Sequence, residues 1–212
     1  MSEAPRILTD VAKRRTRLSD LGIEEAALRG AVEFGVSEAS RCTPNDPPTA
    51  RGLIRWARTV GALRDAMTTR GWRRVDDENY PRVERPDGKV ALAVSAGDIY
   101  TGTLRNPRTP PRGNASKTVI NRNQMLLADF AADHDFPRDA RDAQPETWLL
   151  LSYEDDDAGE TRSELALPVG MEVDGSIAAW GERIILDPIS HRPEPIAEPD
   201  ETIDVEVKRR TG

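Results

Sequence analysis

The sequence contains few of the residues from which catalytic thiol sites and structural metal sites are built. Cys42 is the only cysteine among 212 residues, and His134 and His191 are the only histidines. A single thiol forms neither an internal disulfide nor a cluster of thiolates for structural zinc. A nucleophilic thiol also needs a neighbouring base, and no sequence pattern pairs Cys42 with either histidine. We therefore interpret Cys42 as a small buried side chain.

Three common nucleotide-binding and hydrolase motifs are also missing. The chain has no G-x-x-x-x-G-K-[ST] phosphate loop, no G-x-G-x-x-G dinucleotide loop and no G-x-S-x-G nucleophile elbow. These absences favour a protein that is not an enzyme and that needs no cofactor. They assign no catalytic residue.

Long apolar runs are absent as well. No segment approaches the roughly 18 continuous apolar residues that a membrane-spanning helix needs. The first 17 residues place their basic cluster after the apolar ones and lack the apolar centre of a secretory signal. We therefore expect a cytoplasmic protein that does not associate with membranes.

Charge is plentiful but unevenly distributed along the chain. The net charge is -7, yet residues 1–144 carry 24 bases and 20 acids, whereas residues 145–212 carry 6 bases and 17 acids. Such a division predicts one basic and one acidic face, which could bind a polyanion or pair with an oppositely charged partner or copy. The distribution does not choose between these alternatives.

The clearest helix signal lies between residues 53 and 67. Apolar residues recur there at spacings of three and four, at Leu53, Trp56, Val60, Leu63 and Met67. At about 100° per residue, Arg51, Arg55 and Arg58 fall on the opposite side. The arginines are interpreted either as a solvated outer face or as a phosphate-binding face.

An apolar strand, residues 90–96, runs into a long loop at residues 97–117. The loop carries four bases and one acid, together with three glycines and several hydroxyl side chains. Glycines let backbone amides approach an anion, and hydroxyls and bases bind phosphate. The candidate phosphate or nucleic-acid ligands are Thr101, Arg105, Arg108, Arg112 and Lys117. The alternative interpretation is a surface connector held extended by its prolines.

Asp98 is the candidate metal ligand. It follows a strand that we expect to be central, and open sheets often place ligand groups at such strand ends. Asp46, Asp76 and Glu84 could join it around a divalent cation. Aspartates in these settings also commonly cap turns, and this alternative stays open.

These patterns predict an α+β fold. It has two N-terminal helices, a central antiparallel or mixed sheet of about five to six strands, and one helix after the long loop, at about 116–134. The first N-terminal helix is expected from Asp20 to about Arg41, with an apolar side formed by Ile23, Ala27, Ala31 and Phe34. We expect a flexible basic arm over 1–19, one domain over 20–186, a proline-rich linker over 187–201 and an edge strand and tail over 202–212.

The favoured function is a non-enzymatic binding or accessory protein of bacterial type that acts through a protein partner or its own copy. The first alternative is binding of nucleic acid or nucleotide through the arginines of the 53–67 helix and the bases of the 97–117 loop. The second is a metal-dependent hydrolase or nuclease centred on Asp98. The ligand and the oligomeric state do not follow from the sequence.

Overall fold

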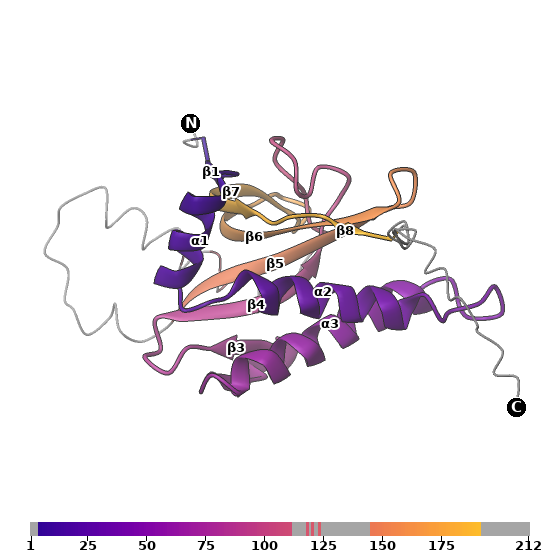
Figure 1. The fold of residues 1–212 in the computed structure, drawn as a ribbon, viewed down its shortest axis with the longest axis horizontal. Coiled ribbons are helices and arrows are strands. Elements are labelled where there is room, and N and C mark those ends of the chain that lie inside the picture. Colours follow the sequence, from indigo (N-terminus) through magenta and orange to yellow (C-terminus); the bar gives the residue numbers. More distant parts are fainter. Residues whose placement is uncertain (1–3, 112–117, 119, 121–122, 124–144, 192–212) are drawn as a thin grey trace, which may run out of the picture.

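The computed structural model describes residues 4–111, 118, 120, 123 and 145–191, shown in colour in Figure 1. The helices with described bounds are α1 (Val11–Asp20), α2 (Glu25–Ala39) and α3 (Ala50–Thr68), with a short 3-10 turn at Asp77–Asn79. The strands are β1 (Arg6–Leu8), β2 (Arg73–Val75), β3 (Arg82–Glu84), β4 (Val90–Ala96), β5 (Glu146–Asp155), β6 (Glu160–Met171), β7 (Ile177–Ile185) and β8 (Ile189–Ser190). Within the described residues, no helix is long and apolar enough to cross a bilayer.

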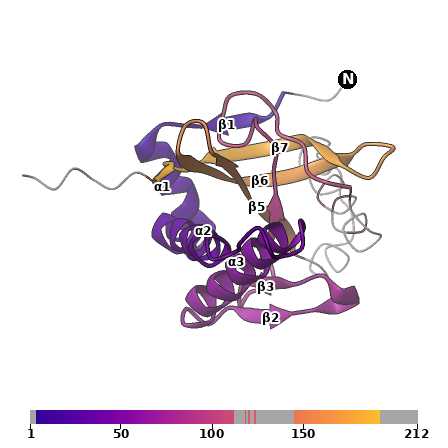
Figure 2. The same cartoon turned by 90° about the vertical axis from the view of Figure 1, so that its right-hand side faces the viewer.

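The strands form one mixed sheet in the order β1-β7-β6-β5-β4-β3-β2, and β8 pairs with β6. The pairs β1 with β7 and β4 with β5 are parallel, whereas the other pairs are antiparallel. The prediction of a mixed sheet with helices is therefore confirmed, although the described residues already contribute eight strands instead of the five or six predicted. Helices α2 and α3 cover one face of this sheet (Figure 2).

The sheet has a separate core on each face, because successive side chains of a strand point to opposite sides. Leu92, Leu150 and Leu165 face the helices and pack with residues such as Leu28 and Met67. The alternate positions, including Leu149 and Ala166, pack on the other face around Trp180. Burial on both faces agrees with the continuous apolar run predicted to be a central strand.

The first twenty residues correct one prediction. Residues 6–8 form β1 and residues 11–20 form α1, so this segment is no flexible arm. Asp10 caps α1 by accepting a hydrogen bond from the backbone N–H of Lys13. Arg14 is buried, bonds to Glu25 and donates to the carbonyl of Ile185. A residue of the basic run therefore attaches α1 to α2 and to β7.

The helix predicted from Asp20 to Arg41 is shorter than expected. Asp20 ends α1, and Gly22 takes a φ of 75° in the turn that separates the two helices. Phe34 was predicted to face the core but is 47% exposed. Gly35 lies against α3 instead, because a Cβ there would be 2.0 Å from Oγ1 of Thr59.

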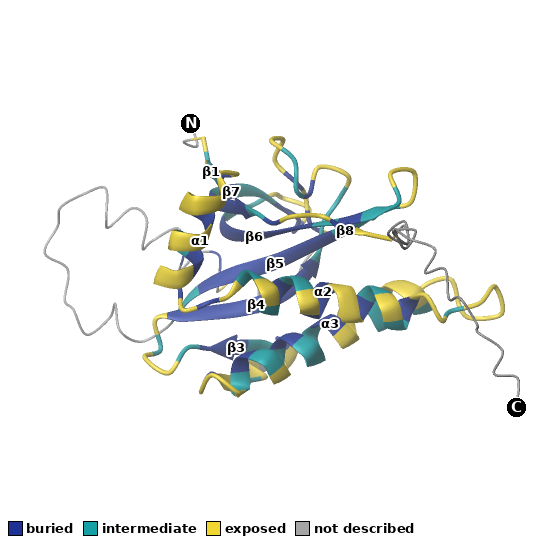
Figure 3. Cartoon of the chain, viewed as in Figure 1, coloured by how far each residue is buried: buried dark blue, intermediate teal, exposed yellow. Residues whose placement is uncertain are grey.

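Helix α3 confirms the predicted helix but not all of its predicted core face. Leu63 and Met67 are buried, whereas Leu53 is 61% exposed and Trp56 is 37% exposed. The reason is position: the buried residues of α3 begin at Thr59, so only its second part lies against the sheet. Figure 3 shows the resulting exposed positions along the helix.

The central strand agrees with its predicted bounds, and the turn before it has Gly88 at φ 71° as a proline-aspartate-glycine corner requires. The helix predicted at 116–134 falls mostly outside the described residues, although Thr118, Ile120 and Asn123 are helical. The edge strand and tail at 202–212 lie wholly outside them. So does the linker, apart from its first residues, which include β8.

Candidate functional site

The α3 arginines point to internal carboxylates. Arg51 and Arg55 both bind Glu154 at the end of β5, with 3.2 Å between Nη1 of Arg55 and the carboxylate. The hydrogen bond to Glu154 is the largest cause of the raised pKa of Arg51. Arg58 lies 3.7 Å from Glu38 of α2. Two of the three arginines proposed to bind phosphate therefore share a carboxylate of the chain itself.

The segment from Gly97 to Pro111 is held on the sheet by a buried ion pair. Arg183 of β7 and Glu164 of β6 have fully buried side chains, and Nε of Arg183 donates to Glu164 over 2.8 Å. Nη2 of Arg183 donates to the carbonyl of Thr103, and the backbone N–H of Gly102 donates to Glu164, each over 2.8 Å. Both charges thus also bind the backbone of the loop.

The loop has further contacts closer to Pro111. Trp180 donates its indole N–H to the carbonyl of Pro107 over 2.9 Å. Thr109 exchanges hydrogen bonds with Ile177, one through its backbone and one through its hydroxyl. The described part of the loop therefore covers β6 and β7 as a structural layer.

The predicted anion ligands of this loop have different surroundings. Thr101 is fully buried, and its hydroxyl has no hydrogen-bond partner. The guanidinium of Arg105 stacks 5.4 Å from the ring centre of Tyr100, and Arg108 pairs with Asp174 and Ser176. Arg112 and Lys117 lie outside the described residues. A single basic surface formed by the loop and α3 therefore remains a prediction.

Asp98 accepts a hydrogen bond from the backbone N–H of Tyr100, which is the role of a turn cap. The three carboxylates considered beside it have other partners: Asp46 binds Thr43, Asp76 binds Arg64, and Glu84 binds Arg73 and Arg82. Within the described residues, no group of three histidine, cysteine or acidic side chains could hold a metal ion.

Two exposed apolar side chains of α3 lie where β4 ends. Trp56 donates its indole N–H to the carbonyl of Val94 over 3.3 Å, and Leu53 lies one turn earlier on α3. Ile99 and Tyr100 are also exposed, but they belong to the loop that Glu164 and Arg183 hold on the other face of the sheet. We call Leu53 and Trp56 the β4-end surface.

Trp56 lies at the surface because its indole binds a backbone carbonyl near the end of β4. The pairing of β3 with β4 begins at Arg82 opposite Ala93, so β3 does not extend beside Val94. The indole N–H satisfies the carbonyl that a longer β3 would have bound. Part of the ring consequently remains in solvent, and sequence periodicity could not detect this because it does not specify strand lengths.

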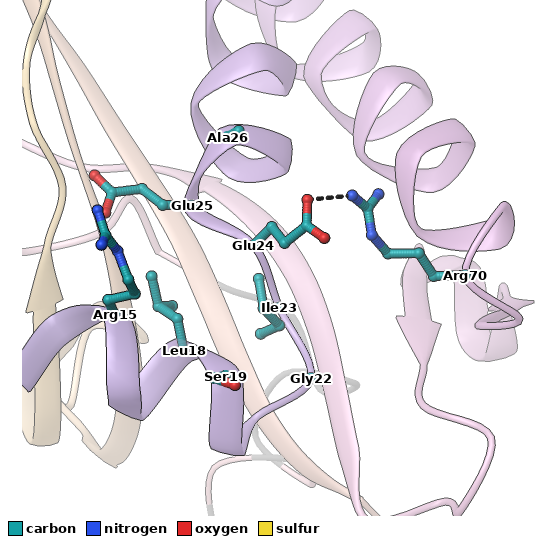
Figure 4. A pocket seen from close by; sticks show the side chains of 9 residues that line it. All are labelled: Arg15, Leu18, Ser19, Gly22, Ile23, Glu24, Glu25, Ala26 and Arg70. Atoms are coloured by element: carbon teal, nitrogen blue, oxygen red, sulfur yellow. Dashed lines mark hydrogen bonds and ion pairs between the residues drawn. The ribbon is translucent and has the colours of Figure 1, made fainter.

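Other hollows lie elsewhere on the described surface, and three of them contain charged side chains of interest. One of about 670 Å³ lies between α1 and α2, where Arg70 binds Glu24 over 2.5 Å (Figure 4). A second, of about 400 Å³, includes Arg51, Glu154 and His191, and Nε2 of His191 lies 2.8 Å from the hydroxyl of Thr161. The third, of about 500 Å³, lies where β4 and β5 begin.

The arrangement defines a mixed α/β protein with helices on one face of an eight-stranded sheet and an anchored loop near the end of β4. Comparison of the chain with protein-family models, with curated proteins and with solved structures found no match.

Proposed function

We propose that this protein is a non-enzymatic binding protein whose β4-end surface docks on a protein partner. The observation that carries the proposal is the exposure of Leu53 and Trp56 on the helix whose other apolar residues form the core. Exposed apolar side chains that gather in one place are typical of interaction surfaces. Tryptophan, tyrosine and arginine are also the residues most enriched among those that dominate binding energy.

The favoured partner is an acidic protein other than a second copy of the chain. Arg58 is exposed two residues after Trp56 and would form part of a basic rim. Arg51 and Arg55 place two further positive charges near this surface. Both guanidiniums are bound by the carboxylate of Glu154. An acidic partner would therefore be attracted before the apolar contacts form.

The test begins with a photo-crosslinking amino acid placed at position 53 of the full chain in the cells that produce it. A single crosslinked protein, identified by mass spectrometry and then purified, is expected to bind the unmodified chain. Leu53→Glu should weaken that binding at least about tenfold, as for a residue in the centre of an interface. Val173→Glu is the control, because Val173 is fully exposed at a turn.

Equal weakening by both variants would contradict the proposal, and so would the absence of any specific crosslink. Sedimentation at rising concentration distinguishes the alternative in which the partner is a second copy. A crosslink between two copies together with a dimer that Leu53→Glu dissociates would support that alternative over a different protein.

The nucleic-acid alternative uses the exposed Arg58 and Arg105 together with bases outside the described residues. It predicts binding of a labelled DNA or RNA whose affinity falls steeply as salt rises. Binding of that kind, lost on Arg58→Gln and Arg105→Gln but kept on Leu53→Glu, would replace a protein partner with a nucleic acid.

A further inference from the structure

The groove of about 500 Å³ where β4 and β5 begin differs from the other two hollows in its charge. Its lining includes four cations, Arg6, Arg17, Arg85 and Lys89. In the other hollows an arginine is bound to a carboxylate of the same cavity, Arg70 to Glu24 and Arg51 to Glu154, and the first hollow also contains Arg15. The cations of this groove are not all matched in that way.

One carboxylate serves two of the arginines. Glu182 of β7 accepts two hydrogen bonds from Nε of Arg17, each 3.1 Å, and one from Nη2 over 2.9 Å. Arg6 approaches the same carboxylate only to 3.7 Å, and its side chain is 66% exposed. A long, exposed pair of this kind contributes little, so Arg6 is available to a ligand.

The opposite side of the groove contains Arg85 and Lys89. Arg85 binds Asp87 through two hydrogen bonds, of 2.8 and 2.7 Å, and donates to the carbonyl of Asp20. Lys89 is exposed, and among the described residues its ammonium makes no hydrogen bond or close ion pair, although its charge helps to lower the pKa of Asp87. Lys89 is therefore the cation with the greatest unused capacity to bind an anion.

A half-buried carboxyl group lies between these two sides. Glu146, the first residue of β5, accepts a hydrogen bond from the indole N–H of Trp148 over 2.7 Å. Burial is the main cause of its raised pKa, opposed by the Trp148 hydrogen bond and by Arg17. The charged groups that face the groove around it are Arg6, Arg17, Asp20, Arg85, Lys89 and Glu182.

We propose that this groove binds a small oxyanion-bearing ligand, a carboxylic acid or a phosphate ester, with Lys89 as its contacting cation. The site is independent of the β4-end surface, since it lies where β4 begins. A bound anion disfavours the ionised form of Glu146 further, because like charges repel at short distance. Binding therefore takes up a proton at Glu146, and affinity falls as pH rises through the pKa of this carboxyl.

Calorimetry of the full chain with sulfate and with succinate tests the site, because sulfate represents a phosphate group and succinate a carboxylate. Chloride at equal ionic strength is the reference titration. Binding of at least one probe is expected, and Lys89→Gln should weaken it about tenfold or more, as for loss of a hydrogen bond to a charged group. Lys13→Gln is the matched control, because Lys13 is an exposed lysine outside the groove.

The two probes identify the class of ligand. Stronger binding of sulfate supports a phosphate ester, and stronger binding of succinate supports a carboxylic acid. Absence of binding by both, or equal weakening by Lys89→Gln and Lys13→Gln, would overturn the site. None of these results bears on Leu53, so failure here is distinguishable from failure of the proposed function.

The proton coupling has its own test. Sulfate remains a dianion from pH 5 to 8, so its binding is expected to weaken over this range in the unmodified protein. Glu146→Gln should remove the part of that decline due to Glu146 while the variant still binds at pH 5. Identical pH profiles for both proteins would exclude Glu146 as the coupled group.

Discussion

Two arginine–carboxylate clusters of the described chain differ in burial, and this difference distinguishes a structural ion pair from surface ion pairs. Arg183 and Glu164 are completely buried between the sheet and the loop. Arg51 and Arg55 bind Glu154 at the surface, with the Arg51 side chain 51% exposed and that of Arg55 20% exposed. Similar residue types at similar distances are therefore expected to contribute very different free energies of unfolding.

The largest expected effect is on the buried pair. Arg183→Met leaves the Glu164 carboxylate buried without its cation, which should lower the free energy of unfolding by about 3–5 kcal/mol. Urea unfolding followed by circular dichroism measures this change. The double variant Arg183→Met/Glu164→Leu should recover much of the loss, because replacing both charges by apolar side chains removes the unpaired group. If Arg183→Met lowered the free energy of unfolding by less than about 1 kcal/mol, burial of the ion pair would not determine its contribution to stability.

A smaller effect is expected at the loop residue that donates to the buried carboxylate. Gly102 has a φ of 72°, and an added Cβ would lie 2.9 Å from Cβ of Arg162. Gly102→Ala should destabilise the protein by about 2–4 kcal/mol, from the left-handed backbone and the close contact together. Gly88→Ala is the matched control, because Gly88 has a φ of 71° with nothing within 4 Å. Equal losses of stability in Gly102→Ala and Gly88→Ala, measured by thermal or urea unfolding, would show that the loop is not closely packed against β6.

The smallest effect is expected at the surface cluster. Glu154→Gln removes the negative charge that Arg51 and Arg55 both bind. At low salt it should lower the free energy of unfolding by about 0.2–1 kcal/mol per pair. In 1 M sodium chloride the difference from the unmodified protein should shrink, since exposed charges are screened. The Arg183→Met loss should persist at the same salt. If the Glu154→Gln loss also persisted, the two clusters would be equivalent in spite of their exposure.

Local structure was predictable where local rules suffice. The bounds of β4, the turn at Gly88 and the helix from Leu53 to Met67 follow from apolar period and turn chemistry. The basic run after Val11 was misinterpreted as an arm, because charge alone does not reveal that Arg14 will be buried against Glu25.

The candidate site was predictable only in part. The loop after β4 was predicted either to bind an anion or to act as a connector, and its anchoring on β6 and β7 was not foreseen. A weak pattern signal existed, because Glu164 directly precedes the apolar residues 165–167 and Arg183 directly precedes Ile184 and Ile185, and charges beside buried segments need a partner. The groove at Lys89 had no comparable signal, since its cations come from β1, α1 and the turn before β4.

The amino-acid sequence by itself determined where β4, the turn before it and the helix from Leu53 to Met67 lie, because these depend on neighbours a few residues away. Only the tertiary structure decided which arginines pair with carboxylates or carbonyls of the chain and which stay available to a partner. Arg51 meets Glu154 across 103 residues, and Arg183 meets the carbonyl of Thr103 across 80. Such pairings depend on strand order and burial, which a single sequence does not encode in any local pattern.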